Sequence, residues 1–464
     1  MIKGHMGNTL AYIILFLFPI VSIRLYQKKT IQEATLWVVL GGFMLLAVKT
    51  EVDFPLIPPI GKHSMPVLSM IIGCWFIKGK SINYFKHKSM LSFLSIFILF
   101  LPFITTELNT DSFVIGGHWV PALTHHDALS AIINKFLFIT PFFIGVQFFR
   151  HYKDQILMFK ILMIAGLWYS IPIIYEVRMS PQLHSAFYGY FPHSFLQQRR
   201  MGGFRPVVFM GHGLWVAFFI ACALTVAVTL QRIGEGVRRF PAVMVNYFLL
   251  TILLLCKSMA SIMYGLFSFF MISKMSYQAQ FRAAILLAIL AIIYPTLSII
   301  KVFPHQAISE IADTYMGPER AESLNFRFKN EDLLLEHGRE RFFFGWGGWG
   351  RNRVYDEETG KDKTITDGRW IITFGTSGWI GFMVEFLMMA LAIFRAKKAA
   401  LLSKDNKQKR LLAAHALLVS IIMIDQLPNA SLEPWLWLVV GVLLGCSEQV
   451  IADSKGQNTA TILY

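Results

Sequence analysis

Long apolar runs alternate with short polar connections along most of this chain. A bilayer-spanning helix needs about 20 mainly apolar residues, and irregular backbone is excluded from contact with lipid, so each run predicts a membrane helix. Thirteen such runs cover residues 8–23, 31–48, 64–77, 89–106, 131–149, 156–175, 208–230, 242–256, 258–273, 283–300, 374–394, 411–424 and 435–447. The eighth and ninth runs are short and adjoin at Lys257, so a single tilted helix is an alternative there and the expected number is 12 or 13.

The composition supports this interpretation. Of the 464 residues, 55% are hydrophobic and only 15% are charged, which leaves too few polar side chains to cover several soluble domains. The predicted fold class is therefore an all-α integral membrane protein with one large loop outside the membrane. We expect residues 1–300 to hold ten helices with an outside loop at 176–207, residues 301–373 to form the large periplasmic loop, and residues 374–447 to hold the last three helices.

The basic residues predict the orientation. One set of connections carries 23 Lys and Arg residues, whereas the short connections of the opposite set carry only Lys3, Lys49, Lys62, Lys135 and Lys257. The positive-inside rule places the richer set, and the tail at 448–464, in the cytoplasm, so the N-terminus is expected outside. This explains the net charge of +15 without nucleic acid, for which no basic and aromatic binding motif is present. The predicted location is the bacterial inner (plasma) membrane, with membrane lipids as contacts.

The large loop carries most of the candidate chemistry. Acidic residues recur at helical spacing beside Leu333–Leu335, which predicts a short amphipathic helix lying on the membrane. A run rich in Phe, Gly and Trp follows at Phe342–Arg351, and a polar stretch ends at Asp367-Gly368-Arg369-Trp370. The active face is therefore expected on the periplasmic side.

Three patterns resemble the O-antigen ligase and O-antigen polymerase superfamily. Ser323–Arg327, a helix and then Phe344–Gly347 resemble the arginine, helix and glycine-tryptophan-glycine succession of that family's large loop. Asp367–Gly381 is similar to the following segment, where the family usually has a histidine in place of Asp367. Arg205–Gly213 resembles the arginine, phenylalanine and histidine segment at the start of a central helix, and Lys257-Ser258 stands where many members have a Ser-Arg pair.

The resemblance implies a reaction and a set of site residues. Such proteins move a glycan from an undecaprenyl-diphosphate carrier to a glycan or lipid acceptor, and arginine matches the geometry and charge of the leaving diphosphate. The predicted catalytic residues are Arg327, Arg205, Asp367 and His212, and the predicted substrate-binding residues are Arg199, Arg200, Lys257, Arg369, Trp346 and Trp349. No metal or other cofactor is required if the arginines stabilise the leaving group. Polymerase and ligase remain equally open, and polysaccharide export or chain-length proteins are possible partners.

Each of these residue types also has an ordinary structural role. Loop arginines commonly pair with acids or lipid headgroups, Asp367 fits a turn or helix cap, Trp346 and Trp349 fit interfacial anchoring, and His212 fits a bonded interior histidine. Glu51 and Asp53 form an acidic pair of the kind that metal-dependent transferases use, and a metal site at His118, His125, His126 and Asp127 is a weaker alternative. A lipid-linked sugar flippase or transporter and a non-catalytic export subunit are the competing function classes.

Overall fold

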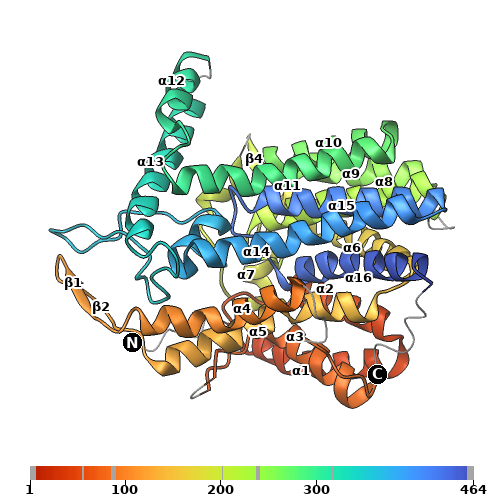
Figure 1. Ribbon diagram of the computed structural model, residues 1–464, viewed down its shortest axis with the longest axis horizontal. Helices are drawn as coiled ribbons and strands as arrows, with labels where there is room; N and C mark the ends of the chain where they lie inside the picture. Colours follow the sequence, from red (N-terminus) through yellow and green to blue (C-terminus); the bar gives the residue numbers. More distant parts are fainter. Residues whose placement is uncertain are drawn as a thin grey trace.

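The computed structural model describes residues 7–54, 57–84, 90–200, 202–236, 241–315 and 318–456. Helices dominate this part of the chain, and the strands form only two short antiparallel hairpins (Figure 1). The side chain of Arg200 and the last eight residues of the predicted tail, 457–464, lie outside the described residues.

A helix coincides with each of the thirteen predicted apolar runs. These helices are α1 Thr9–Lys28, α2 Ile31–Leu45, α3 Ser64–Ile72 with the π-helical turn η1 Gly73–Ile77, α4 Met90–Glu107, α5 His125–Phe148, α6 Tyr152–Met179, α8 Gly213–Ile233, α9 Ala242–Leu255, α10 Met259–Lys274, α11 Tyr277–Ile299, α14 Arg369–Leu402, α15 Asn406–Asp425 and α16 Pro434–Ser454. The eighth and ninth runs are separate helices, because the chain turns at Lys257, which has a φ of 52°.

Further helices and two hairpins occupy the longer connections. They are α7 Leu183–Tyr188, the 3₁₀ turn η2 Leu196–Gln198, α12 His305–Tyr315 and α13 Pro318–Glu340, with the hairpins β1 Phe113–Ile115 with β2 His118–Val120 and β3 Arg199–Arg200 with β4 Gly203–Phe204. A helix is present near residue 333, but it is not short: it is part of the 23-residue α13, which begins 15 residues before Leu333, and its placement on the membrane stays a prediction.

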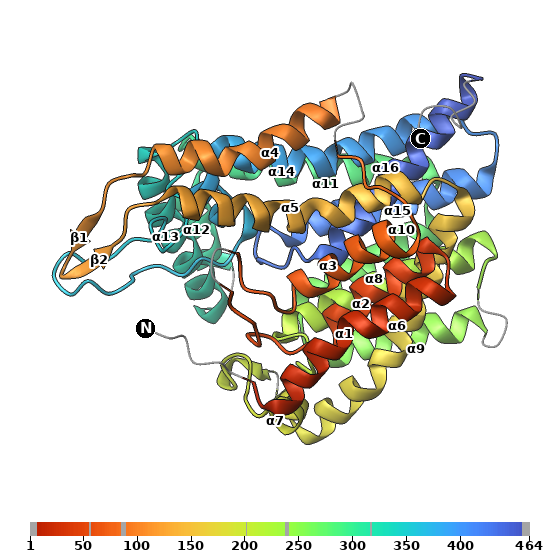
Figure 2. The ribbon, with the colours of Figure 1, turned by 90° about the horizontal axis from the view of Figure 1, so that it is seen from below.

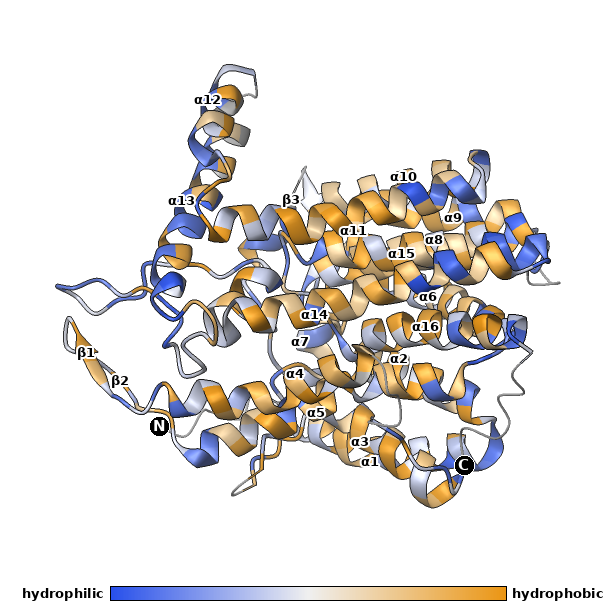
Figure 3. Cartoon of the chain, viewed as in Figure 1, coloured by the Kyte–Doolittle hydropathy of each residue, from blue (hydrophilic) through white to orange (hydrophobic). Residues whose placement is uncertain are grey.

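Seven helices in the described part of the chain are long and apolar enough to cross a membrane: α1, α5, α6, α8, α11, α14 and α16. Five further apolar helices are shorter, at 10–17 residues. Hydrophobic residues fill the middle of the bundle while hydrophilic residues gather at its two ends (Figure 3). This distribution agrees with an all-α, multi-pass membrane protein.

The two ends of the bundle differ in structure. The long helices run lengthwise, and α12 and α13 lie across one end, where the β1–β2 hairpin also projects (Figures 1 and 2). α1 begins toward this end and α16 finishes at the opposite one. The segment between α11 and α14 therefore forms a cap over one end of the bundle.

Close helix packing sets the position of α5. A Cβ added at Gly441 of α16 would lie 2.1 Å from the carbonyl oxygen of Phe142, and one added at Gly145 of α5 would lie 2.7 Å from the backbone nitrogen of Val442. Small residues at such an interface let two helix backbones approach closely inside a membrane bundle. α5 is consequently held against the core along its second half, which fixes the polar side chains of its first half.

One sequence-based assignment and one boundary need correction. Lys135 was counted with the outside connections although it falls inside the predicted run 131–149, and the structure places it within α5, where Glu385 provides a counter-charge. The eleventh helix was expected to begin at residue 374, but α14 begins at Arg369. Hydropathy misses the start of α14 because a basic residue lowers the local average even when a buried carboxylate neutralises it.

Candidate functional site

The glycine-tryptophan loop after α13 inserts into a break in α14. Gly378, in the middle of α14, has φ 68° and ψ −174°, which interrupts the helix. The amides of Trp346 and Gly347 donate to the carbonyl oxygens of Gly375 and Thr376 at 2.8 and 2.9 Å. Polar backbone groups inside a bundle must be paired, so this loop satisfies the end of the first half of α14.

The same loop also satisfies the start of the second half. The amides of Trp379 and Ile380 donate to the carbonyl oxygens of Phe342 and Phe343 at 2.8 and 3.3 Å. A Cβ on Gly378 would lie 2.2 Å from the carbonyl carbon of Phe343, so only glycine fits this approach. The motif glycines thus join the cap to the bundle.

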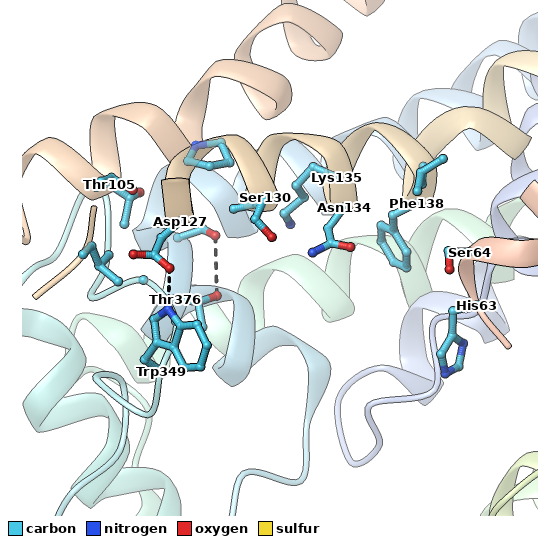
Figure 4. Close-up of a pocket in the computed structure, with 18 of the residues that line it drawn as sticks. His63, Ser64, Thr105, Asp127, Ser130, Asn134, Lys135, Phe138, Trp349 and Thr376 are labelled. Atoms are coloured by element: carbon cyan, nitrogen blue, oxygen red, sulfur yellow. Dashed lines mark hydrogen bonds between the residues drawn. The ribbon is translucent and has the colours of Figure 1, made fainter. Parts of the chain in front are cut away.

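A cavity of about 520 Å³ lies beside this junction. It is bounded by α4, the first half of α5, the glycine-tryptophan loop, the first half of α14 and the starts of α3 and α16. Its polar lining includes His63, Asp127, Asn134, Lys135, Trp349 and Arg369. Figure 4 shows Trp349 and Asp127 at one end, Lys135 and Asn134 between, and His63 with Ser64 at the other end.

α5 supplies a polar face to the cavity. Asp127, Ser130 and Asn134 recur at intervals of three and four residues, which places them on one side of a helix, and all three line the cavity (Figure 4). Asp127 also forms a capping box with Thr124, whose amide and hydroxyl donate to Oδ2 at 2.8 and 2.6 Å. The first turn of α5 is therefore rigidly held.

Trp349 forms part of the cavity wall in a strained conformation. Its φ is 58°, a region that costs a bulky L-residue on the order of 1 kcal/mol or more, and its side chain is 66% exposed. Its indole Nε1–H donates to Asp127 Oδ1 at 2.7 Å. This bond orients an exposed aromatic ring that has little packing of its own.

A buried carboxylate carries two cations at the cavity wall. Glu385, in the second half of α14, is fully buried and accepts from Arg369 Nε and Nη2 at 2.8 and 3.0 Å. Lys135 Nζ lies 3.6 Å from Glu385 Oε2, the oxygen that also accepts from Arg369 Nη2. Both cations line the cavity. One carboxylate neutralises only one of these two cations. The group of Glu385, Arg369 and Lys135 therefore has one excess positive charge beside the cavity.

A histidine and a glutamate meet at the opposite end of the cavity. His63, directly before α3, has its Nδ1 2.9 Å from Oε2 of Glu433, directly before α16. The carboxylate raises the pKa of His63 above its ordinary value. The two residues are 370 positions apart in the sequence and hold the starts of two helices together.

A smaller cavity of about 260 Å³ brings together two of the predicted catalytic residues. Arg327 on α13 and Asp367 before α14 both line it, and both side chains are exposed. Among the described residues, neither side chain has an ion-pair or hydrogen-bond partner. Asp367 faces this smaller cavity and Arg369 faces the larger one, so the motif around Gly368 forms the wall between them.

The other predicted residues form a third group at the start of α8. Arg205 Nη2 donates to the carbonyl oxygen of Lys257 at 3.1 Å, and the ring of His212 lies 4.7 Å from that of His193. His212 Nδ1 accepts from the amide of Leu214 at 3.0 Å and so caps α8. Burial lowers the pKa of His212 to about 4, which keeps its ring neutral.

Two predicted substrate-binding residues, Trp346 and Arg199, lie outside both cavities, one buried and the other exposed. The structure places Trp346 within the protein, where its Nε1–H donates to the carbonyl oxygen of His337 at 2.9 Å and its ring stacks on His337 at 4.4 Å. Arg199 is exposed on β3, away from both cavities as they are lined. Of the predicted aromatic pair, Trp349 is the one that a ligand can reach.

Sequence reasoning missed four ionisable residues of the larger cavity and its wall. Lys135 and Glu385 carried a usable signal, because ionisable residues inside apolar runs are functional candidates. His63 and Glu433 carried none, since nothing in the sequence links two positions so far apart. Arg351 was missed as a structural residue: it is fully buried and donates to the carbonyl oxygens of Asp111 and Pro121 at 2.6 and 2.8 Å.

Within the described ranges, no three His, Cys, Asp or Glu side chains gather as a metal-binding group, so the alternatives at Glu51 and at His118 gain no support. The expectation that no cofactor is required stays a prediction. No protein-family profile matches this sequence, and no curated protein matches it.

Proposed function

We propose that this protein is a membrane glycosyltransferase that moves a glycan from an undecaprenyl-diphosphate carrier to a second glycan or a lipid acceptor. The proposal joins the sequence resemblance to O-antigen polymerases and ligases with the chemistry of the larger cavity. Surface polysaccharide synthesis, as O-antigen, capsule or exopolysaccharide, is the process that such a reaction serves.

The observation that carries the proposal is the group of Glu385, Lys135 and Arg369. Transfer of a glycan releases a diphosphate, so negative charge develops on the leaving oxygen, and fixed cations in a water-poor site stabilise it. Arg369 is held by a fork-to-fork contact with Glu385, which keeps its guanidinium in place while Lys135 supplies the excess charge. The site is thus built before the substrate arrives.

The rest of the cavity suits a glycan. Its volume of about 520 Å³ lies within the range of about 300–1,000 Å³ that is usual for small-molecule sites. Hydroxyl and amide groups of Ser130, Asn134 and Thr376 line it, and these are groups that hydrogen-bond sugar hydroxyls. Trp349 offers an exposed ring on which a sugar face can stack. Arg327 and Asp367, in the neighbouring cavity, stay candidates for contact with the remainder of the glycan.

A charge-removing substitution at Lys135 tests the proposal. The full chain is purified into lipid nanodiscs and supplied with lipid-linked glycan extracted from a strain that lacks the gene, and the release of undecaprenyl diphosphate is measured. Lys135→Gln keeps a polar side chain of similar reach without the charge. We expect its transfer rate to fall on the order of 10²-fold, as for loss of one preorganised group at developing charge.

Lys160→Gln is the matched control. Lys160 also pairs with a glutamate, Glu235, at 3.2 Å, but both side chains are partly exposed and neither lines the cavity. An exposed pair is worth under about 1 kcal/mol, so this variant should transfer glycan within about a factor of five of wild type. Equal behaviour of the two variants, or no release by wild type, contradicts the proposed site.

The lipid-linked glycans that accumulate in the deletion strain decide between polymerase and ligase. Mass spectrometry that finds single repeat units on the carrier indicates a polymerase, whereas long chains retained on the carrier indicate a ligase.

Transport is the second candidate, and one observation favours it. A helix that is broken at Gly378, beside an ion group shared by α5 and α14, is a feature that transporters also use at their binding sites. The two functions differ in chemistry, because a transporter leaves its lipid-linked glycan intact. Release of free undecaprenyl diphosphate therefore separates them.

A further inference from the structure

His63 and Glu433 have the arrangement of a general base and the group that orients it. Oε2 of Glu433 lies 2.9 Å from Nδ1 of His63. The proton on Nδ1 therefore points at the carboxylate, and Nε2 carries the lone pair. His63 is 50% exposed in its side chain, while Glu433 is only 8% exposed. No described residue hydrogen-bonds Nε2. The pair thus combines a buried orienting group with an accessible base.

Local structure supports a role beyond helix capping. Glu433 is the residue directly before α16, where a side chain commonly accepts from the first amides of the helix, yet its carboxylate makes no such cap. Pro434 follows at the first helical position and also lines the cavity. The carboxylate therefore contacts His63 instead of capping the helix. The rings of His63 and Trp215 pack in a T-shaped arrangement, with their centroids 6.5 Å apart.

The charges around His63 come from two connections, the one between α2 and α3 and the one between α15 and α16. Glu433 raises the pKa of His63 most, and Glu51, from the connection after α2, raises it further. Lys62 lowers it, although the Lys62 ammonium is turned toward the carbonyl oxygens of Leu46 and Phe209 at 2.6 and 2.9 Å, and burial lowers the pKa of Lys62 itself to about 7. The carboxylates dominate, so His63 is a stronger base than an isolated histidine.

We propose that His63, oriented by Glu433, is the catalytic base that activates the acceptor hydroxyl. This inference rests on the proposed glycosyltransferase function. His63 Nε2 takes the proton of the acceptor O–H, the acceptor oxygen forms a bond to the anomeric carbon, and the bond from that carbon to the diphosphate oxygen breaks. The bonding electrons leave with the diphosphate, beside Lys135 and Arg369, and the proton remains on His63 until it exchanges with water.

The placement of the residues fits this direct displacement. His63 lies at one end of the cavity and Lys135 lies farther along it, so a sugar between them has the base on one side and the Lys135 ammonium on the other (Figure 4). Attack opposite the leaving group inverts the anomeric carbon, and a single base is what such a reaction needs. The carrier side of the reaction needs no base, because a diphosphate is a good leaving group once its charge is compensated.

The test compares two histidine–carboxylate pairs in the purified full chain in nanodiscs. His63→Ala and His63→Asn remove the base at the cavity, and His125→Ala removes a histidine that is 3.1 Å from Glu107 but is not among the cavity-lining residues. The measured quantities are the release of undecaprenyl diphosphate, the affinity for farnesyl diphosphate as a probe of the cation site, and the thermal-unfolding midpoint. We expect both His63 variants to lose on the order of 10²-fold or more in rate, with probe affinity and midpoint within a few-fold and a few degrees of wild type.

The pH profile gives a readout that a structural role would not move. A base must be neutral, so the wild-type rate should fall as the pH drops through the pKa of His63. Glu433→Gln removes the carboxylate that raises this pKa, so the acidic limb should shift to lower pH and the maximal rate should fall less than in His63→Ala. His125→Ala should leave both rate and profile within a factor of about two of wild type.

Other outcomes overturn the inference in distinct ways. If the His63 variants transfer glycan within a few-fold of the wild-type rate, His63 is not the catalytic base, and the proposed glycosyltransferase function still stands. If the rate, the probe affinity and the thermal-unfolding midpoint all fall together, the His63–Glu433 pair only stabilises the fold and His63 is not the base. Absence of release by wild type removes the proposed function and this inference with it.

Discussion

Trp349 is a large aromatic residue in a backbone conformation that usually belongs to glycine. Its φ is 58° and its ring, at 66% exposed, has little packing, while its side-chain hydrogen bond within the described part of the chain goes to Asp127. Strain of this kind persists where the position of a side chain matters to a ligand. At the residue scale, the two tryptophans of one short motif therefore have separable roles.

Alanine substitutions should separate these roles. Trp349→Ala should lower glycan transfer by about 5- to 10-fold, by analogy with aromatic contacts worth about 1 kcal/mol, and should leave the thermal-unfolding midpoint nearly unchanged. Trp346→Ala, by contrast, removes a buried ring, at a cost of about 3–5 kcal/mol, and should lower the midpoint clearly. Unchanged transfer in Trp349→Ala would show that no sugar contacts this ring.

The break in α14 is the feature that turns a loop into part of the bundle. Four backbone hydrogen bonds pass between residues 342–347 and the two halves of α14, which would otherwise leave unpaired groups at the break. The first half then supplies Arg369 and Thr376 to the cavity and the second half supplies Glu385. At the scale of elements, the site depends on this junction more than on any single helix.

Two glycines of the junction give a matched test. Gly378→Ala places a Cβ in a conformation nearly exclusive to glycine and 2.2 Å from the backbone of Phe343, so we expect a loss of stability on the order of 3 kcal/mol or more. Gly348→Ala, in the same motif, meets no atom within 4 Å and should change stability by less than about 0.5 kcal/mol. Limited proteolysis of residues 341–368 and the thermal-unfolding midpoint measure both. A junction unaffected by Gly378→Ala would contradict the account of how the loop is held.

The sequence could predict the helices because their signal is local. An apolar run predicts its own burial in a helix, so a helix coincides with each of the thirteen runs, although several helix ends lie outside the predicted ranges, as where α14 begins at Arg369, whose charge is neutralised by Glu385. The motifs around Arg327 and Asp367 were also local, and the structure places both at one cavity. The pair of His63 and Glu433 could not be predicted, because their contact depends on how α3 and α16 pack, which no single segment encodes.

At the scale of the whole molecule, the remaining prediction is the orientation of the bundle. Lys361 lies in the cap between α13 and α14, and Lys404 lies between α14 and α15 at the other end. The part of α14 that follows the break at Gly378 runs to Leu402 and is about 36 Å long at about 1.5 Å per residue, which exceeds the hydrocarbon core of about 30 Å. The basic residues of 395–410 should hold the Lys404 end in the cytoplasm and leave the cap outside.

Single introduced cysteines measure this orientation directly. The four native cysteines are all buried, so they give little background with a membrane-impermeant maleimide. Both target side chains are exposed, which makes them comparable labelling sites. The reagent is added to cells in which it can reach the outer face of the plasma membrane. Lys361→Cys should be labelled in these intact cells, and Lys404→Cys should be labelled only after the plasma membrane is permeabilised. Labelling of both from one side would mean that α14 does not cross the membrane, and the cavity at its break would then have to be placed anew with respect to the lipid-linked substrate.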